Sequence, residues 1–240
     1  MTDKRITLVT GASRGIGYAA AKALAAAGHH VIATARTQGG LEALDDEISR
    51  AGGSVTLVPM DLREFEGIDR LAEALHARYG RLDGMFVNAG VLGAITPVNH
   101  TTLKDWDQIL DVNLTAPFRM IRALDPLLRA SPSGRAVFVS SSVARAPRAY
   151  WGAYAASKAA LETLALCWAD EIENVSDIRV SLLNPGGTRT QMRAKAMPGE
   201  DASVLPGPED IAPLVVDMLG ESWEGAQGEL VSYREWAKTR

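Results

Sequence analysis

The stretch Ile6-Thr-Leu-Val-Thr-Gly-Ala-Ser-Arg-Gly-Ile-Gly17 decides the fold of this chain. Its first five residues are apolar or β-branched, which is typical of a buried parallel strand. Gly11, Gly15 and Gly17 follow, and an alanine-rich helical pattern then runs to about Ala27. This order of strand, glycine loop and helix suits a dinucleotide pyrophosphate, because glycines let the backbone approach it and a helix N-terminus attracts anions. The spacing departs from the strict G-x-G-x-x-G, so a glycine-rich turn without a ligand is the alternative.

Short apolar segments and helical patterns alternate along the rest of the chain, with no linker, repeat or low-complexity stretch. The alternation predicts an α/β fold: one doubly wound domain over residues 1–240, with a central parallel sheet of about seven strands flanked by helices. Residues 188–207, rich in methionine, proline and charge, are expected to form a mobile flap over the site. We expect further strands at 30–35, 55–58, 84–88, 135–140, 179–183 and 228–232, and helices at 41–51, 64–79, 102–129, 154–174 and 208–219.

Composition and charge exclude several classes of protein. Of the 240 residues, 47% are hydrophobic and 22% charged, as in a globular protein with a large core. A net charge of −4 gives no attraction to nucleic acid or to an anionic membrane. The single Cys167 permits no intramolecular disulfide, and the histidines show no metal-ligand spacing, so we expect no metal. Residues 1–5 are polar and no apolar run is long enough for a membrane span, so we expect a cytoplasmic protein without a signal peptide.

The residue that follows the second strand bears on the choice of dinucleotide. An acidic residue there would bind the ribose 2′-hydroxyl of NAD, but the strand at 30–35 is followed by Arg36. An arginine suits a 2′-phosphate, and Arg14 in the glycine loop could supply a second positive charge. We therefore expect NADP(H) to be preferred, with NAD(H) as a second cofactor that the site could accept. The alternative is that both arginines are ordinary solvated side chains.

Tyr154 and Lys158 form the candidate catalytic pair. Residues four apart on a helix lie on one face, one turn from each other. Tyrosine ordinarily has a pKa of about 10, too high for proton transfer at neutral pH, and a fixed ammonium nearby favours the phenolate and lowers that pKa. The same spacing also occurs by chance on solvated helices. A catalytic role for the pair is therefore supported by the motifs around it and not by the spacing alone.

Those motifs follow one another in a fixed order. After Thr10-Gly-x3-Gly-x-Gly17 come Asp61-Leu62, Asn88-Ala-Gly90, Asn113, the serines 140–142, Tyr154-x3-Lys158 and Pro185-Gly186. In this order and spacing, the chain resembles the classical short-chain dehydrogenase/reductase family over nearly its whole length. The resemblance implies a Rossmann-type parallel sheet, a nicotinamide cofactor and an Asn-Ser-Tyr-Lys tetrad. The segment Arg148–Tyr154 further resembles that of a bacterial subgroup of the family.

The resemblance also implies a role for each member of the tetrad. Tyr154 exchanges a proton with the carbonyl or alcohol oxygen, Lys158 lowers the pKa of Tyr154 and binds the nicotinamide ribose, and Asn113 holds a water. The serine is Ser141 or Ser142, and we favour Ser141 because it lies thirteen residues before Tyr154, the usual family interval. With the two arginines included, the expected cofactor-binding residues are Gly11, Ser13, Arg14, Gly15, Ile16, Gly17, Arg36, Asp61, Leu62, Asn88, Ala89, Gly90, Tyr154, Lys158, Pro185, Gly186 and Thr188.

The leading hypothesis is an NADP(H)-dependent oxidoreductase that transfers a hydride between the nicotinamide and a carbonyl compound or secondary alcohol. The alternative is a non-catalytic, dinucleotide-binding regulatory protein on the same fold. We expect a small-molecule substrate and a homodimer through the two long helices. A homotetramer is less well supported, because Leu230–Trp236 replaces the C-terminal sequence that commonly stabilises it in the family. The charges of Arg189, Arg193 and Lys195 in the expected flap either meet an acidic substrate or face water.

Overall fold

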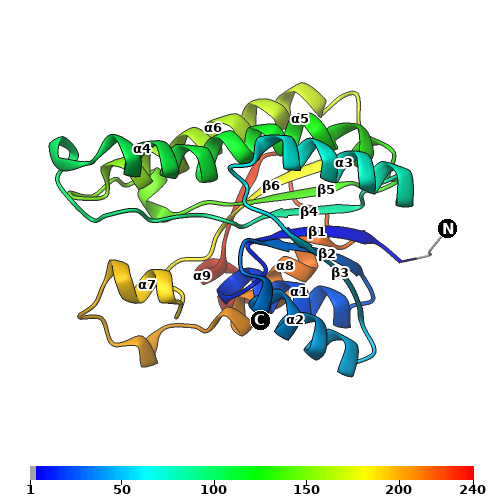
Figure 1. Cartoon of the computed structure of the whole chain (residues 1–240), viewed down its shortest axis with the longest axis horizontal. Helices are drawn as coiled ribbons and strands as arrows, with labels where there is room; N and C mark the ends of the chain where they lie inside the picture. The colour runs from blue at the N-terminus through cyan, green and yellow to red at the C-terminus, as the bar shows by residue number, and fades with distance from the viewer. Residues whose placement is uncertain (1–3) are drawn as a thin grey trace.

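The computed structural model describes residues 4–240 and has a seven-stranded parallel sheet between two layers of helices (Figure 1). The strands are β1 (Ile6–Thr10), β2 (His30–Ala35), β3 (Ser54–Pro59), β4 (Gly84–Val87), β5 (Arg135–Val139), β6 (Arg179–Asn184) and β7 (Glu229–Ser232). The helices are α1 (Gly15–Ala26), α2 (Gln38–Arg50), α3 (Phe65–Tyr79), α4 (Leu103–Leu110), α5 (Ala116–Arg129), α6 (Gly152–Ile172), α7 (Gln191–Ala196), α8 (Pro208–Leu219) and α9 (Tyr233–Trp236).

The strand order in the sheet is β3-β2-β1-β4-β5-β6-β7, and all neighbouring pairs are parallel. The chain starts in the middle of the sheet, builds out to one edge, returns beside β1 and then builds out to the other edge. This confirms the expected doubly wound α/β fold. The order reverses between β1 and β4, and in open α/β sheets ligands bind beyond the carboxyl ends of the strands at such a switch point.

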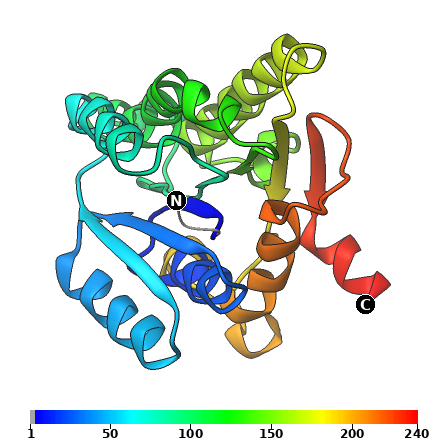
Figure 2. The ribbon, with the colours of Figure 1, turned by 90° about the vertical axis from the view of Figure 1, so that its right-hand side faces the viewer.

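The sheet is covered on both faces, which explains why its strands are apolar almost throughout. Figure 2 shows α3, α5 and α6 on one side of it and α1, α2 and α8 on the other. Successive strand residues point to opposite faces, so Leu8 packs in the core under α3, α5 and α6, whereas Val9 packs in the core under α1, α2 and α8. No helix in residues 4–240 is both long enough and apolar enough to cross a membrane.

The helix expected over residues 102–129 is interrupted in the structure. Helix α4 ends at Leu110, Asp111–Thr115 form a wider π-helical turn, and α5 continues from Ala116. The N–H of Ala116 donates to the Asp111 carbonyl, five residues back. Pro117 accounts for the wide turn, because proline has no N–H with which to continue the four-residue pattern. The interruption is therefore a local widening that carries Asn113.

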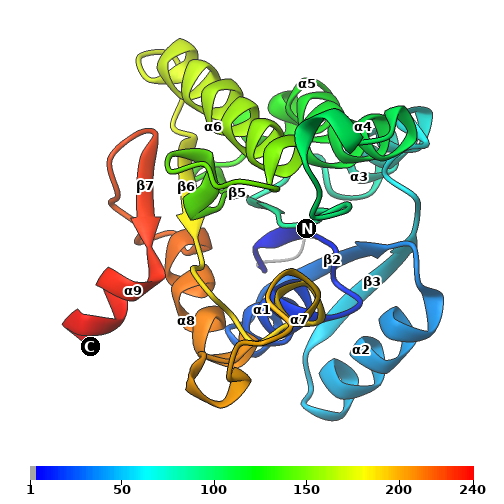
Figure 3. The same ribbon diagram turned by 90° about the vertical axis from the view of Figure 1, so that its left-hand side faces the viewer.

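The segment expected to form a flap contains a short helix, α7, that its composition does not reveal. Thr190 caps this helix by accepting a hydrogen bond from the N–H of Arg193 at 3.2 Å. The helix lies outside the carboxyl ends of the strands, in front of α1 (Figure 3). Its position agrees with a segment that covers the end of the sheet.

The amino-terminal ends of the strands, here called the amino edge of the sheet, face the viewer in Figure 2. A buried carboxylate lies there, just before β4. Asp83 accepts hydrogen bonds from the N–H of Ile6 at 2.8 Å, the hydroxyl of Ser131 at 2.6 Å and the Nε of Arg81 at 3.1 Å. Arg5 donates to the Asp83 carbonyl at 2.9 Å. This cluster ties the starts of β1 and β4 to the turn before β5.

Candidate active site

The glycine loop after β1 is fixed to the end of β4. The hydroxyl oxygen of Thr10 accepts hydrogen bonds from the N–H groups of Asn88 at 2.9 Å and Ala89 at 3.0 Å. The side-chain amide of Asn88 donates in return to the Thr10 carbonyl at 2.9 Å. Gly11 has a φ of +68°, and a Cβ there would lie 2.9 Å from the Asn88 amide nitrogen. Only glycine therefore allows the two strand ends to approach this closely.

A cavity of about 460 Å³ opens at the carboxyl-terminal ends of the strands, here called the carboxyl edge of the sheet. The structure brings together around it all but two of the residues that the sequence assigned to the site. The two exceptions, Gly17 and Asn113, lie behind its wall. The assigned residues that line the cavity are Gly11, Ser13, Arg14, Gly15, Ile16, Arg36, Asp61, Leu62, Asn88, Ala89, Gly90, Ser141, Tyr154, Lys158, Pro185, Gly186 and Thr188.

Gly17 supports the loop from behind. A Cβ at this position would lie 2.4 Å from the Gly11 carbonyl oxygen and 2.5 Å from the amide nitrogen of Asn88. Such contacts are impossible, so any side chain here would push α1 away from the glycine loop. Gly17 is therefore needed for packing. It was expected to contact the cofactor, but it affects the site only by allowing α1 to lie against the glycine loop.

Asn113 is fully buried and all its described bonds go to protein groups. Its Oδ1 accepts from the N–H of Val91 at 2.8 Å, and its Nδ2 donates to the Val91 carbonyl at 2.9 Å and to the Ser157 hydroxyl at 3.0 Å. The side chain thus ties the segment after β4 to α6. It holds the wall of the cavity in place without lining it.

Tyr154 and Lys158 line the cavity from α6 and are both buried, with 9% and 3% of their surface exposed. The Lys158 ammonium donates to the Val139 carbonyl at 2.7 Å and lies 6.0 Å from the centre of the Tyr154 ring. The Ser141 side chain is hydrogen-bonded to Tyr154. Ser142 is exposed and lines a smaller adjoining cavity instead. Of the two candidate serines, Ser141 is therefore the one beside Tyr154.

Burial controls the pKa values of this pair. It raises the pKa of Tyr154 to about 12, against a smaller lowering by the Ser141 hydrogen bond, and it lowers the pKa of Lys158 to about 8. The direction for Tyr154 is opposite to the one predicted from the Tyr–Lys spacing. Desolvation of the phenolate dominates, because Tyr154 is buried. In the protein alone at neutral pH, Tyr154 keeps its proton.

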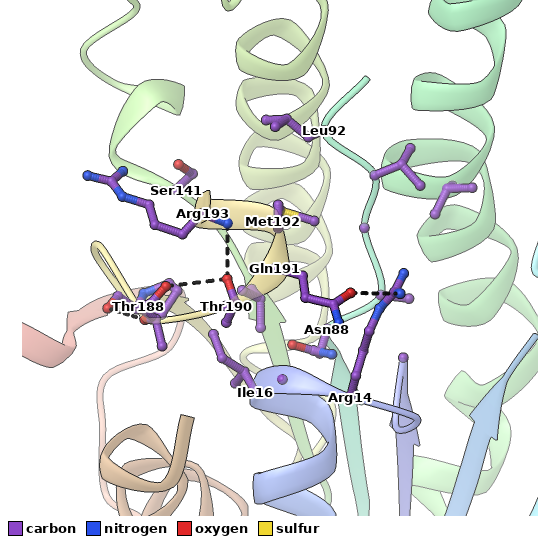
Figure 4. Close-up of a pocket in the computed structure, with 18 of the residues that line it drawn as sticks. Arg14, Ile16, Asn88, Leu92, Ser141, Thr188, Thr190, Gln191, Met192 and Arg193 are labelled. Atoms are coloured by element: carbon purple, nitrogen blue, oxygen red, sulfur yellow. Dashed lines mark hydrogen bonds between the residues drawn. The ribbon is translucent and has the colours of Figure 1, made fainter. Parts of the chain in front are cut away.

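The far end of the cavity is positively charged. Arg36 lies exposed on its wall just after β2, and Arg14 donates to the side-chain oxygen of Gln191 at 3.3 Å, a contact that joins the glycine loop to α7 (Figure 4). Among the described residues that line the cavity, Asp61 is the only acid. Hydrogen bonds from Arg63, at distances down to 2.7 Å, are the main cause that lowers the pKa of Asp61, and the charge of Arg36 adds to it. This end of the cavity suits an anion.

Other residues that line the cavity were not assigned to catalysis or cofactor binding from the sequence, although Arg189 and Arg193 were expected in a flap over the site. Thr190, Gln191, Met192 and Arg193 reach it from the start of α7, beside Thr188 (Figure 4). The capping threonine was the signal that could have revealed this helix. The remaining unassigned residues come mostly from the ends of strands and the segments after them, and Val112, Ala196 and Pro208 come from the π turn, the end of α7 and the start of α8. They are Thr34, Ala35, Thr37, Met60, Val91, Leu92, Val112, Val139, Ser140, Trp151, Arg189, Ala196 and Pro208.

The residues present fit a dinucleotide. The first turn of α1 has neither a side-chain cap nor an acidic residue, so its N–H groups are open to a phosphate. The buried Thr34 hydroxyl on the cavity wall has no hydrogen-bond partner in the described part of the chain. A Cβ at Gly90 would contact the Lys158 ammonium at 3.7 Å, so the glycine keeps this side of the ammonium free of a side chain. Residues 4–240 contain no group of three or more His, Cys, Asp or Glu side chains that could hold a metal ion.

Known proteins are similar to this chain in sequence and fold. The family model for short chain dehydrogenases matches residues 5–201. The uncharacterized oxidoreductase YciK of Escherichia coli (strain K12) is 41% identical over 92% of this chain and 88% of its own. A short chain dehydrogenase from Shigella flexneri 2a str. 301, solved with NADP, has a TM-score of 0.92 and 40% identity, covering 98% of both chains. One from Escherichia coli CFT073, solved with NADPH, has a TM-score of 0.90 and 40% identity, again over 98% of both chains. This chain is therefore an oxidoreductase that belongs to the short-chain dehydrogenase/reductase family and acts on CH–OH and C=O groups.

Proposed function

We propose that the protein is an NADP(H)-dependent reductase of carbonyl compounds, with Tyr154 as the proton donor. The observation that carries the proposal is that Tyr154, Ser141 and Lys158 line the same cavity as the glycine loop. A dinucleotide and a small carbonyl compound would therefore share one space, as a transfer between them requires. NADPH, when bound, supplies the hydride, while the protein supplies the proton and the orientation.

The pKa values favour reduction at neutral pH. With a pKa of about 12, Tyr154 holds its proton and can give it to a carbonyl oxygen that becomes an alkoxide. Ser141, hydrogen-bonded to Tyr154, orients the same oxygen. Lys158, with a pKa of about 8, can gain or lose a proton near neutral pH and can restore that of Tyr154. Asn113 acts as a positioning residue through Val91 and Ser157.

Charge and the solved relatives both support NADP(H) as the cofactor. Arg36 and Arg14 stand where a 2′-phosphate would be expected, and no free carboxylate among the described lining residues opposes it. The two solved relatives above hold NADP and NADPH. NAD(H) would lack the phosphate contact and should be the poorer cofactor.

We extend the proposal to a homodimer through the two long helices, one formed by α4 and α5 and the other by α6. These helices carry exposed apolar side chains: Leu103 is 80% exposed, Phe118 46%, Trp106 38% and Leu166 37%. Large apolar groups gathered on neighbouring helices usually mark a surface that a second chain covers. The oligomeric state can be measured by light scattering, and a monomer at micromolar concentration would contradict this part of the proposal.

The decisive experiment is a screen of aldehydes and ketones for NADPH consumption, repeated with NADH. We expect turnover with at least one carbonyl class and catalytic efficiency about tenfold or more higher with NADPH. A protein that binds NADPH tightly but reduces none of the compounds would favour the alternative, a regulatory dinucleotide-binding protein. No described contact at present favours that alternative.

A further inference from the structure

A second cavity, of about 160 Å³, adjoins the main one beside Ser141. The two cavities share Ser141, Trp151, Gly186 and Arg193 as lining residues. The small cavity therefore begins where the carbonyl group of a substrate would be held. Figure 4 shows Arg193 next to Ser141, on the opposite side of the pocket from Arg14. It is a candidate site for the part of the substrate that extends away from the cofactor.

The lining of this side cavity is cationic. It contains Arg148 and Arg193 and, among the described residues, no acidic side chain. Arg193 is paired with Glu200 through Nε and Nη2, which leaves its Nη1 without a described hydrogen bond. The Arg148 side chain makes no hydrogen bond or ion pair with any residue in 4–240, although it lies within reach of the cavity. Both arginines thus line one small space, and each has guanidinium donors without a described hydrogen bond.

The segment that carries Arg148 is held in a defined shape. The N–H of Trp151 donates to the Arg148 carbonyl at 3.2 Å, and the N–H of Thr96 donates to the Tyr150 carbonyl at 3.0 Å. Tyr150 has a φ of +73°, the only described non-glycine residue with a positive φ. Such a conformation is unfavourable for tyrosine and persists only where the surroundings enforce it. Arg148 therefore lies on a constrained turn directly before Trp151 and Tyr154.

The opposite part of the substrate space is apolar. Leu92, Trp151 and Met192 line the main cavity, and the Trp151 and Tyr154 rings meet edge to face at 6.1 Å between their centres. A substrate with an apolar body and one charged end would match both parts of the site. A neutral ketone would leave the guanidinium donors unused.

We propose that the carbonyl substrate carries an oxyanion, a carboxylate or a phosphate ester, which Arg148 and the free Nη1 of Arg193 bind while Ser141 and Tyr154 hold the carbonyl. This inference rests on the proposed reductase function and adds the class of substrate. The oxyanion is unchanged in the reaction, in which the carbonyl carbon gains the hydride and its oxygen gains the proton. Planar guanidinium groups bind such oxyanions through paired, charge-assisted hydrogen bonds.

The test uses matched pairs of ketones with the full-length protein and NADPH. One arm compares a keto acid with its methyl ester, and the other compares a keto phosphate with the same compound lacking the phosphate. We expect the charged member of at least one pair to have a catalytic efficiency about tenfold or more higher, as one charge-assisted contact would give. The arm with the larger preference identifies the oxyanion.

The variant Arg148→Gln should reduce that preference about tenfold, whereas Arg148→Lys should keep part of it. As a matched control, Arg50→Gln removes the same charge from the exposed end of α2 and should leave the preference unchanged. Calorimetry in the presence of NADP⁺ gives an independent readout, in which benzoate should bind more tightly than benzamide to the wild type but not to Arg148→Gln.

The outcomes separate this inference from the function on which it rests. If no carbonyl compound is reduced, the reductase function itself fails. If neutral ketones are reduced as efficiently as their charged partners, or if Arg148→Gln keeps the full preference, the reductase function stands and the oxyanion site is wrong.

Discussion

At the amino edge of the sheet, Asp83 is buried with hydrogen-bond donors on both carboxylate oxygens, whereas at the carboxyl edge Lys158 is equally buried with one described acceptor, the Val139 carbonyl. The two groups have nearly the same exposure, 2% and 3%. A charged group that is fully paired holds the structure together and has no capacity left for a ligand. One that is buried with few partners has a shifted pKa and can exchange protons. Burial alone therefore does not distinguish a structural charge from a functional one, but the number of its partners does.

The largest effect that this comparison predicts is on turnover at the carboxyl edge. Tyr154→Phe should lower kcat about 10²- to 10⁴-fold, because only the proton donor is lost. The dissociation constant for NADPH and the free energy of unfolding should change little. Steady-state kinetics, a cofactor titration and urea unfolding measure the three quantities. Tyr18→Phe removes a hydroxyl that bonds to Glu47 away from the cavity, and this control should keep its activity. Turnover of Tyr154→Phe within a few-fold of wild type would rule out the assignment.

At the amino edge the opposite result is expected. Asp83→Ala should lower the free energy of unfolding by about 3–5 kcal/mol, because it removes the acceptor of the Ile6 N–H and of the Ser131 hydroxyl and the carboxylate that forms an ion pair with Arg81. The KM for NADPH of the folded fraction should stay near the wild-type value, since Asp83 lies at the far end of the sheet. Asp83→Asn keeps one oxygen acceptor and should lose less stability. Equal unfolding curves for Asp83→Ala and wild type would show that the cluster is not structural.

The pH dependence of stability sharpens the same contrast. Burial lowers the pKa of Lys158 from 10.5 to about 8, so between these pH values the unfolded chain binds a proton that the folded one does not. Stability from this group is therefore lost as pH falls through 8 and gained as pH rises. We expect a gain of about 2 kcal/mol from pH 8 to 9.5 that is absent from Lys158→Met.

Tyr154 keeps its proton in the folded protein throughout this window, since its pKa there is raised to about 12, and in the unfolded chain it only begins to lose it, at its ordinary pKa of about 10. Denaturant unfolding of the wild type and Lys158→Met at the two pH values gives the difference directly. Parallel changes in the two proteins would mean that Lys158 titrates as an ordinary exposed lysine.

Much of the fold and the site could be predicted, because the positions of the strands determine the fold and the residues at their carboxyl ends form the site. Apolar runs covered on both faces locate the strands, and the order of the motifs places Asn88, Ser141 and Pro185 after β4, β5 and β6, at one edge. Parallel strands bring such residues together whatever lies between them in sequence. The clustering of the site is thus a consequence of topology, which the sequence pattern reveals.

What could not be predicted depends on packing between distant residues. The contacts of Asn113 with Val91 and Ser157 come from how the π turn at Asp111–Thr115 packs against α6 and the segment after β4. The direction of the Tyr154 pKa depends on how much water the finished site excludes, and spacing on one helix carries no such information. Helix α7 was missed because six residues are too few for a clear hydrophobic period, although Thr190 marked its start.

The smallest effect is expected on the exposed wall of the carboxyl edge, where Arg36 is the proposed partner of the 2′-phosphate. A phosphomonoester carries roughly −1.5 to −2 charges at neutral pH, and one arginine contact should give about a tenfold preference for NADPH. Arg36→Ala should remove most of that preference with little loss of efficiency with NADH, and Arg36→Lys should keep part of it. Since Arg36 is exposed, the wild-type preference should shrink as salt is raised. Catalytic efficiency with each cofactor at low and high salt tests this. Equal use of both cofactors by the wild type, or equal losses with both in Arg36→Ala, would show that Arg36 is a solvated charge like those elsewhere on the surface.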